Sequence, residues 1–293
     1  MKILVGVDGS TSSDAALDEA ARRPWPAGSE FSVVTVVDPF FFSRSPQLLE
    51  ESKRSTLEGL REQSKRLTDC GWPVHVDIIL DNPRHALPRA ASAWGAHLVV
   101  LGSHGRSAIE RLILGSTAQA VLRHATCSVE IVRPRREPKT GDAMCVIVPT
   151  DGSAFAELAL REVSTRPWPA ESQFKIVSCP EFPVLVGEYP YYPTEKMAEL
   201  MKSSNDHAQA SALQGEEMLA KAGLKATFEI TEPKDSPAAA ILAAAKQWKA
   251  DLIVMGSHGR RGFDRLILGS VSETVALHAP CSVEVVREPH GPA

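Results

Sequence analysis

Gly102-Ser103-His104-Gly105 follows the apolar run LVVL at residues 98–101, and after nine further residues the chain continues as Gly115-Ser116-Thr117. The pattern returns with identical spacing as Gly256-Ser257-His258-Gly259, nine residues, and Gly269-Ser270-Val271. A short apolar run that ends in glycine predicts a buried strand. A Gly-Ser pair ahead of an amphipathic stretch predicts the start of a helix. Each copy therefore predicts a strand, a glycine-rich loop and a helix.

The rest of the 293-residue chain repeats in the same way. VGVDGS at residues 5–10 returns 143 positions later as VPTDGS, and RPWPA at residues 23–27 returns at the same offset. The glycine-rich copies lie 154 positions apart, so the second half carries extra residues, which we place in surface loops. A length near twice that of a typical domain and an internal repeat together predict two domains of one kind. The junction, RPRREPKTGDAM, has the composition of a linker.

Within each half, β-branched apolar runs alternate with amphipathic stretches, which is typical of βαβ units and a parallel sheet. In the first half we predict strands at residues 3–7, 31–37, 74–80, 98–101 and 128–132. We predict helices at residues 13–22, 46–70, 83–94 and 116–124. Asn82-Pro83 and Ser236-Pro237 each put a capping side chain before a proline at the first helical position. Five strands and four helices per half predict a doubly wound α/β sheet.

Composition narrows the class of protein. Hydrophobic residues make up 43% and charged residues 23%, which are ordinary values for a folded globular chain. The net charge of −4 and the absence of a basic cluster argue against a nucleic-acid partner. No apolar stretch reaches membrane-spanning length and the N-terminal run is too short for a secretory signal, so we expect a cytoplasmic location and no membrane partner. Five cysteines without a CxxC pair argue against a disulfide framework.

The glycine-rich element suits a phosphate group. We expect the strand-ending glycine to let a ligand approach the backbone without meeting a Cβ, and the next glycine to adopt a positive φ in a tight turn. At the following helix start, unpaired N–H groups and the positive end of the helix dipole favour an anion. A single GxxG is more often an ordinary turn, but two copies with one spacing favour anion binding. The identity of the anion stays open on these grounds.

With these motifs, the sequence resembles the universal stress protein family, in particular its ATP-binding branch with the G-2x-G-9x-G(S/T) signature. The resemblance covers both halves and includes the aspartate after strand one. It implies domains at residues 1–136 and 143–288, each a Rossmann-like five-stranded parallel sheet in the order 3-2-1-4-5 with helices on both faces. It also implies ATP, or ADP or AMP, at the switch between strands one and four, with Mg²⁺ brought by the phosphates and no metal site of the protein's own.

Site residues follow from the resemblance, position by position. Asp8 and Asp151, with their neighbours, are expected near the adenine and ribose, and Val36 and Cys179 are expected to line the base. In the first half the nucleotide-binding set is Asp8, Gly9, Ser10, Val36, Gly102, His104, Gly105, Arg106, Gly115, Ser116 and Thr117. In the second half it is Pro149, Thr150, Asp151, Cys179, Met255, Gly256, His258, Gly259, Arg260, Gly269, Ser270 and Val271. Pro149-Thr150-Asp151 matches the ATP-binding pattern better than Gly6-Val7-Asp8, so occupancy is the firmer expectation in the second half.

Several signals have two interpretations. Five arginines of the nine-residue loops are either phosphate ligands or solvated charges, namely Arg106, Arg111, Arg260, Arg261 and Arg265. His104 and His258 either donate to phosphate or bond locally within the turn. The pairs His124/Cys127 and His278/Cys281 offer only two metal-ligating groups each, so we expect packing roles. Aromatic residues after strand two, at 40–42 and 189–193, either form a nucleotide lid or subunit contact, or cover exposed core.

The resemblance further implies that strand five pairs edge to edge, here between residues 128–132 and 282–286 of one chain. The chain would then be an intrachain pseudo-dimer, with a homodimer as a further possibility. The leading function is a nucleotide-binding stress or regulatory protein, and the alternative is a slow ATP hydrolase or an adenylating enzyme. We identify no catalytic residue, because no GxxxxGK[ST] loop, GxSxG elbow or SGGxDS motif is present. A dinucleotide oxidoreductase is excluded by the absence of GxGxxG after strand one.

Overall fold

The computed structural model describes residues 1–42, 45–105, 114–134, 142–180, 194–231, 236–260 and 268–288. The first half runs β1 (Lys2–Gly6), α1 (Thr11–Arg22), β2 (Glu30–Val37), η1 (Pro39–Phe42), α2 (Pro46–Thr68), β3 (Val74–Leu80), α3 (Pro83–Trp94), β4 (Leu98–Gly102), α4 (Ser116–His124) and β5 (Ser128–Val132). All five strands and four helices predicted for this half are confirmed. α1 begins two residues earlier than predicted because the Ser10 hydroxyl caps it, accepting a bond from the Ser13 amide at 3.2 Å.

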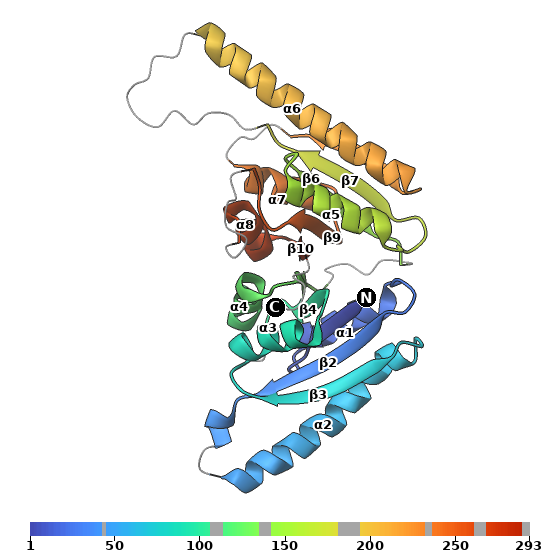
Figure 1. Ribbon diagram of the computed structural model, residues 1–293, viewed down its shortest axis with the longest axis vertical. Helices are drawn as coiled ribbons and strands as arrows, with labels where there is room; N and C mark the ends of the chain where they lie inside the picture. The colour runs from blue at the N-terminus through green and yellow to red at the C-terminus, as the bar shows by residue number, and fades with distance from the viewer. Residues whose placement is uncertain are drawn as a thin grey trace, which may run out of the picture.

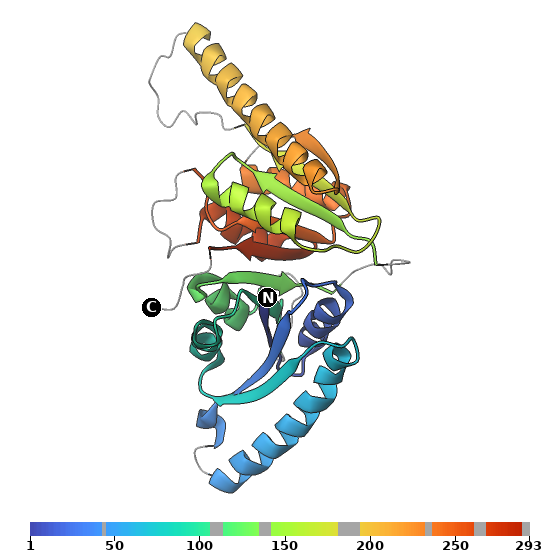
Figure 2. The ribbon, with the colours of Figure 1, turned by 45° about the vertical axis from the view of Figure 1, so that its right-hand side comes forward.

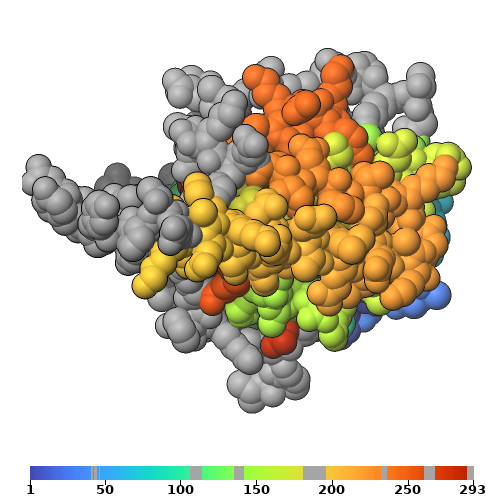
Figure 3. Space-filling view, turned by 90° about the horizontal axis from the view of Figure 1, so that it is seen from above, coloured from blue at the N-terminus to red at the C-terminus, as the bar shows by residue number. Residues whose placement is uncertain are grey.

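The second half repeats this order (Figure 1). It runs β6 (Cys145–Thr150), α5 (Ala154–Thr165), β7 (Gln173–Ser178), α6 (Thr194–Lys221), β8 (Lys225–Ile230), α7 (Pro237–Gln247), β9 (Leu252–Gly256), α8 (Ser270–His278) and β10 (Ser282–Val286). α6 is longer than its counterpart α2 and extends across the end of the molecule (Figure 3). Both predicted proline starts are present, since Asn82 caps α3 and Ser236 caps α7.

The strands form one ten-stranded sheet in the order β3-β2-β1-β4-β5-β10-β9-β6-β7-β8. Within each half the strands are parallel and the order is 3-2-1-4-5, as the family resemblance implies. The halves join through an antiparallel pair, in which Glu284 of β10 lies opposite Glu130 of β5. Because the central pair is antiparallel, the carboxyl ends of the strands in one half face the opposite way from those in the other. The halves are stacked, with α2 and α6 at opposite ends (Figures 1 and 2).

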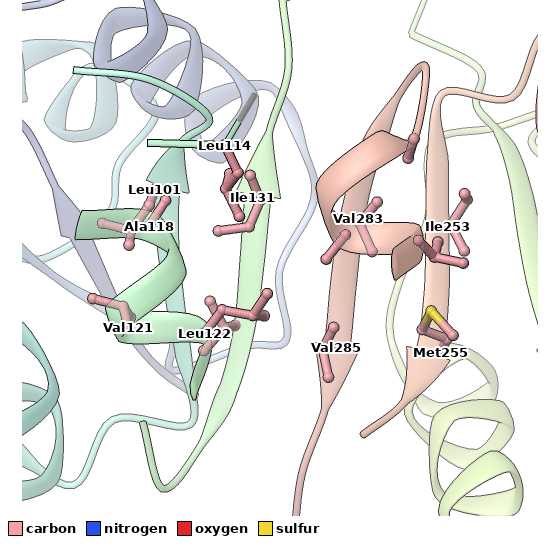
Figure 4. Close-up of a cluster of buried hydrophobic side chains, with 14 of the residues drawn as sticks. Leu101, Leu114, Ala118, Val121, Leu122, Ile131, Ile253, Met255, Val283 and Val285 are labelled. Atoms are coloured by element: carbon pink, nitrogen blue, oxygen red, sulfur yellow. The ribbon is translucent and has the colours of Figure 1, made fainter. Parts of the chain in front are cut away.

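Helices cover both faces of the sheet because the strand side chains alternate between two apolar faces. On one face, a single buried cluster under α3, α4, α7 and α8 runs without a break from one half to the other. Leu122 and Ile131 meet Val283 and Val285 across the β5–β10 pair within this cluster (Figure 4). On the other face, each half has its own cluster, under α1 and α2 or under α5 and α6. The shared cluster makes the two halves one packed body.

Buried ion pairs fill the centre of that second face. Arg23 binds Glu130 with two bonds of 3.1 and 2.8 Å, and Arg166 binds Glu284 at 2.8 Å. The Arg23 guanidinium also stacks over the Trp25 ring, 4.7 Å from its centroid. Burial raises the pKa of Glu130 to about 7, against the opposing effect of Arg23. The repeated RPWPA segment therefore neutralises the carboxylates that face each other where the halves join.

The structure also bears on the His/Cys pairs and on the aromatic residues that follow the second strand of each half. The Cys127 and Cys281 thiols are buried in the shared apolar cluster, whereas His124 and His278 are exposed, which confirms packing roles for the cysteines. Burial raises the pKa of the Cys127 thiol to about 11. Phe40 does not cover exposed core, because 78% of its surface is accessible. The aromatic residues at 189–193 lie outside the described residues.

Candidate functional site

The candidate site of each half lies at the carboxyl ends of its parallel strands. β1 pairs with β2 on one side and with β4 on the other, so the chain leaves neighbouring strands in opposite directions. Open parallel sheets bind ligands at such a switch point. The equivalent point in the second half lies between β6 and β9. Both glycine-rich loops begin here, at Gly102 and Gly256.

An aspartate holds the two loops of each site together. In the second half, the Asp151 carboxylate accepts bonds from the amides of Ser153 and Arg260, each at 3.0 Å. In the first half, Asp8 accepts from the Ser10 amide at 3.0 Å, and the Ser10 hydroxyl donates to the carbonyl of His104 at 3.3 Å. The aspartate after strand one therefore orders the backbone around the glycine-rich loop. The sequence predicted that this residue belongs to the site, but it did not predict that its carboxylate accepts bonds from backbone amides of the site loops.

The glycine-rich loop returns to its own beginning. The amide of Gly115 donates to the carbonyl of Ser103 at 2.8 Å, and Gly269 does the same to Ser257 at 2.9 Å. A Cβ at Gly115 would lie 3.4 Å from the Cα of His104. The first turn of α4 is therefore brought against the GxxG segment. Residues 106–113 and 261–267, which contain Arg106, Arg111, Arg261 and Arg265, lie outside the described residues.

The helices that start at these sites have no side-chain cap, unlike α1, α3, α5 and α7; α2, which follows Ser45, also begins without one. Ser10, Asn82, Ser153 and Ser236 each accept a bond from an amide in the first turn of the helix that they cap. α4 and α8 instead begin after Gly115 and Gly269, with no side-chain cap. The first amides of a helix need an acceptor, and the helix dipole makes that acceptor preferably an anion. Ser116 and Ser270, at the first helical positions, are exposed.

A histidine lies beside each of these helix starts. Nδ1 of His104 is 3.0 Å from the Ser103 hydroxyl, and His258 repeats the contact with Ser257. The local bond that we considered from sequence is therefore present. Nε2 of His104 is buried and has no hydrogen-bond partner within the described parts of the chain. Its hydrogen-bonding capacity is therefore unused within those parts of the chain.

The structure does not bear out the roles expected for two glycines in each glycine-rich loop. A Cβ at Gly102 would lie 2.5 Å from the Ser12 carbonyl oxygen, and one at Gly256 would lie 2.5 Å from that of Phe155. The strand-ending glycines thus make room for α1 and α5, not for a ligand. Gly105 and Gly259 do not have a positive φ; the left-handed turn is made by Gly9 and Gly152.

Gly105 and Gly259 are small for a different reason. A Cβ at Gly105 would lie 2.7 Å from Oδ2 of Asp8, and one at Gly259 would lie 2.7 Å from Oδ2 of Asp151. The missing side chain lets the carboxylate approach the glycine-rich loop. Both glycines therefore belong to the bracing that holds the two loops together.

Other predicted residues lie around this centre. Val36 and Cys179 are half-buried at the carboxyl ends of β2 and β7, whereas Pro149 and Thr150 are buried at the end of β6. The Met255 side chain points into the shared apolar cluster (Figure 4). Any contact from Met255 to a ligand would therefore come from its backbone.

Sequence reasoning missed one contributor to the second site. Nε2 of His207 on α6 lies 2.9 Å from the carbonyl oxygen of Asp151. A Cβ at Gly152 would lie 2.5 Å from the hydroxyl of Ser211, one turn further along α6. Aligning the repeat on Gly71 and Gly223 places Ser55 opposite His207, so this difference between the halves could have been found from the sequence.

The described residues contain neither a metal-binding cluster nor a membrane-spanning helix. No group of three or more His, Cys, Asp or Glu side chains within those ranges is arranged to hold a metal ion. None of the helices described combines the length and the apolar character needed to cross a membrane.

Known proteins resemble this chain over nearly its whole length. The family model of the Universal stress protein family matches residues 1–133 and again 144–287. A universal stress protein of Mycolicibacterium smegmatis is 30% identical over 97% of this chain and 96% of its own length. Universal stress protein E of Escherichia coli is 22% identical over 97% of this chain and 93% of its own. The crystal structure of a universal stress protein from Archaeoglobus fulgidus has the same fold, with a TM-score of 0.68, 22% identity and 98% coverage of both chains.

Proposed function

The chain belongs to the universal stress protein family in both of its halves, and from this membership we propose that each half binds one adenine nucleotide. ATP is the nucleotide proposed, with ADP and AMP as its competitors. The chain would act as a binding protein in a stress or regulatory response, in the cytoplasm. The proposed domains are residues 1–136 and 143–288, and the pairing of β5 with β10 supports the proposal that they form a pseudo-dimer within one chain.

The missing side-chain caps of α4 and α8 carry the proposal. Gly115 and Gly269 start these helices without a side-chain acceptor, whereas α1, α3, α5 and α7 are capped by a side chain. α2 also lacks a side-chain cap, but it begins with Pro46, which has no amide N–H to satisfy at that position. A hydrogen bond to a charged oxygen contributes about 1.5–3 kcal/mol net, against about 0.3–1 kcal/mol from the helix dipole alone. The proposed phosphate ligands are therefore first-turn amides, with the hydroxyls of Ser116, Thr117 and Ser270 beside them.

The surrounding residues fit a nucleotide. Nε2 of His104 is buried and has no hydrogen-bond partner among the residues described, and a phosphate or ribose oxygen would satisfy it. Val36 and Cys179 supply half-buried surface for the base beside the loops that Asp8 and Asp151 brace. Mg²⁺ would enter with the phosphates, which is how this ion is commonly held next to nucleotides.

Calorimetric titration of the full chain with ATP tests the proposal directly. We expect two molecules bound per chain, and we expect inorganic phosphate and GTP to compete poorly. Binding of one molecule or none per chain at saturation would contradict the assignment of a site to each half. Titrations with ADP and AMP then rank the phosphate contacts, since each phosphate removed takes away bonds to the helix amides.

A single-turnover assay separates a binder from an enzyme. With the protein in excess over radiolabelled ATP, we expect hydrolysis to be slower than nucleotide release measured by rapid dilution. Faster hydrolysis would support the alternative function of a slow ATP hydrolase. If a carboxylic acid is added to the same assay, formation of its adenylate with release of pyrophosphate would indicate an adenylating enzyme.

A further inference from the structure

Arg133, the residue after β5, connects the first site to the second half of the chain. The amide of Ser103, in the glycine-rich loop, donates to the carbonyl of Val132 at 2.9 Å. The guanidinium of the next residue, Arg133, donates to the carbonyls of Ala276 and Leu277 at 2.7 and 3.1 Å. Those carbonyls are at the C-terminal end of α8. The N-terminal end of the same helix lies in the second site.

The reciprocal contact exists in the other direction. The amide of Ser257 donates to the carbonyl of Val286 at 3.1 Å. The guanidinium of Arg287, a buried residue, then donates to the carbonyl of Leu122 in the last turn of α4. The first turn of α4 lies in the first site. Arg133 and Arg287 are 154 positions apart, so the repeat places an arginine in both of the contacts that join one half to the other.

These contacts close into a ring, because each helix start is itself bonded to its loop. Gly115 donates to the carbonyl of Ser103, and Gly269 donates to that of Ser257. Each site is thus connected to the other site by a continuous path. The path consists of backbone hydrogen bonds, one arginine and one helix. The ring passes through no atom that the proposed function assigns to the nucleotide base.

The helices in this ring are short, which makes the two ends of each depend on one another. α4 and α8 have nine residues each, and isolated helices below roughly 12–15 residues are marginal in water. An anion at the N-terminus and a guanidinium at the C-terminus both stabilise the same helix. A ligand that fixes the first turn therefore favours the arginine contact at the last turn, and the reverse also holds.

We propose that the two nucleotide sites are positively coupled through Arg133 and Arg287, so that a nucleotide in one half raises the affinity of the other half. This inference rests on the proposed function. Linkage requires the effect to be equal in both directions, and couplings of this kind typically change affinity about 5- to 150-fold. Neither arginine touches the nucleotide in this proposal, so both are positioning residues that act through a helix.

The test compares one-site and two-site proteins. Ser116→Trp and Ser270→Trp are matched substitutions at exposed first-turn positions, and each fills the place of the phosphate with a neutral side chain, so that neither supplies an anion to the helix. ATP titration of these two variants gives the affinity of each site alone. In the unsubstituted chain we expect the second ATP to bind at least about fivefold more tightly than these values predict. In the double variant Arg133→Met/Arg287→Met, we expect the affinity for the second ATP to exceed the one-site values by less than about twofold.

Controls keep the outcomes separate. Arg89→Met/Arg161→Met removes two exposed arginines that stay within their own halves, and it should leave the coupling unchanged. If the double variant does not fold, Arg133→Met alone should still reduce the excess. Two independent sites, or a weaker second site, in the unsubstituted chain would overturn the coupling and leave nucleotide binding intact. A lack of ATP binding in every protein would instead overturn the proposed function.

Discussion

Replacing Gly115 with aspartate should close the first site by giving α4 a cap of its own. Gly115 has φ −60° and ψ 148°, which any residue adopts and which suits a capping aspartate. A Cβ there has no neighbour closer than 3.4 Å outside its adjacent residues, so the backbone has no need to move. The new carboxylate would accept the first-turn amides and repel a phosphate at the same place.

The size of the effect follows from the bonds exchanged. Each amide bond to a charged oxygen contributes about 1.5–3 kcal/mol, which corresponds to a loss of about 10- to 150-fold in affinity for each amide occupied. Stability should change little, because aspartate differs from glycine at this position by only about a few tenths of a kcal/mol. Gly115→Asp is thus expected to lower the affinity of the first site for ATP while leaving the free energy of unfolding nearly unchanged.

Calorimetry with ATP and chemical denaturation measure the two properties on the same sample. We expect Gly115→Asp to bind one ATP per chain and to unfold at the same denaturant concentration as the unsubstituted protein. Gly115→Ala is the matched control, since it adds the same Cβ without an acceptor and should keep both sites. If Gly115→Asp bound two molecules with unchanged affinity, the amides of α4 would not be the phosphate ligands.

Three further predictions concern packing and charge. Gly256→Val should prevent the second half from folding, because its Cβ would lie 2.5 Å from the Phe155 carbonyl oxygen; a soluble variant with unchanged thermal unfolding would contradict this. Glu130→Ala leaves the Arg23 guanidinium buried without its carboxylate, and it should cost about 3–5 kcal/mol in chemical denaturation. The exposed control Glu157→Ala should cost less than about 0.5 kcal/mol. Because burial raises the pKa of Glu130 from 4.5 to about 7, its contribution to stability is greatest below pH 4.5 and falls as the pH rises through about 7. Urea denaturation across that range should show the decline, and an equal decline in Glu130→Gln would assign it to other groups.

Local signals in the sequence predicted most of the fold. Asn82-Pro83 and Ser236-Pro237 marked helix starts that depend only on neighbouring residues, and the structure has them. The apolar runs predicted the strands, because their side chains are buried on both faces of the sheet.

Long-range contacts explain what the sequence did not reveal. Gly102 is small because of Ser12, which is 90 positions away, and no local pattern shows that approach. Glu130 was a missed signal, since a carboxylate in the middle of a buried strand requires a partner. His207 differs from its repeat counterpart Ser55, so comparison of the halves would have marked it for study.

A crystal structure of the protein with Mg·ATP tests the central claim most directly. The account predicts phosphate oxygens about 2.7–3.2 Å from first-turn amides of both α4 and α8. Nucleotide bound elsewhere on the chain, or phosphates that contact only side chains at these loops, would contradict it.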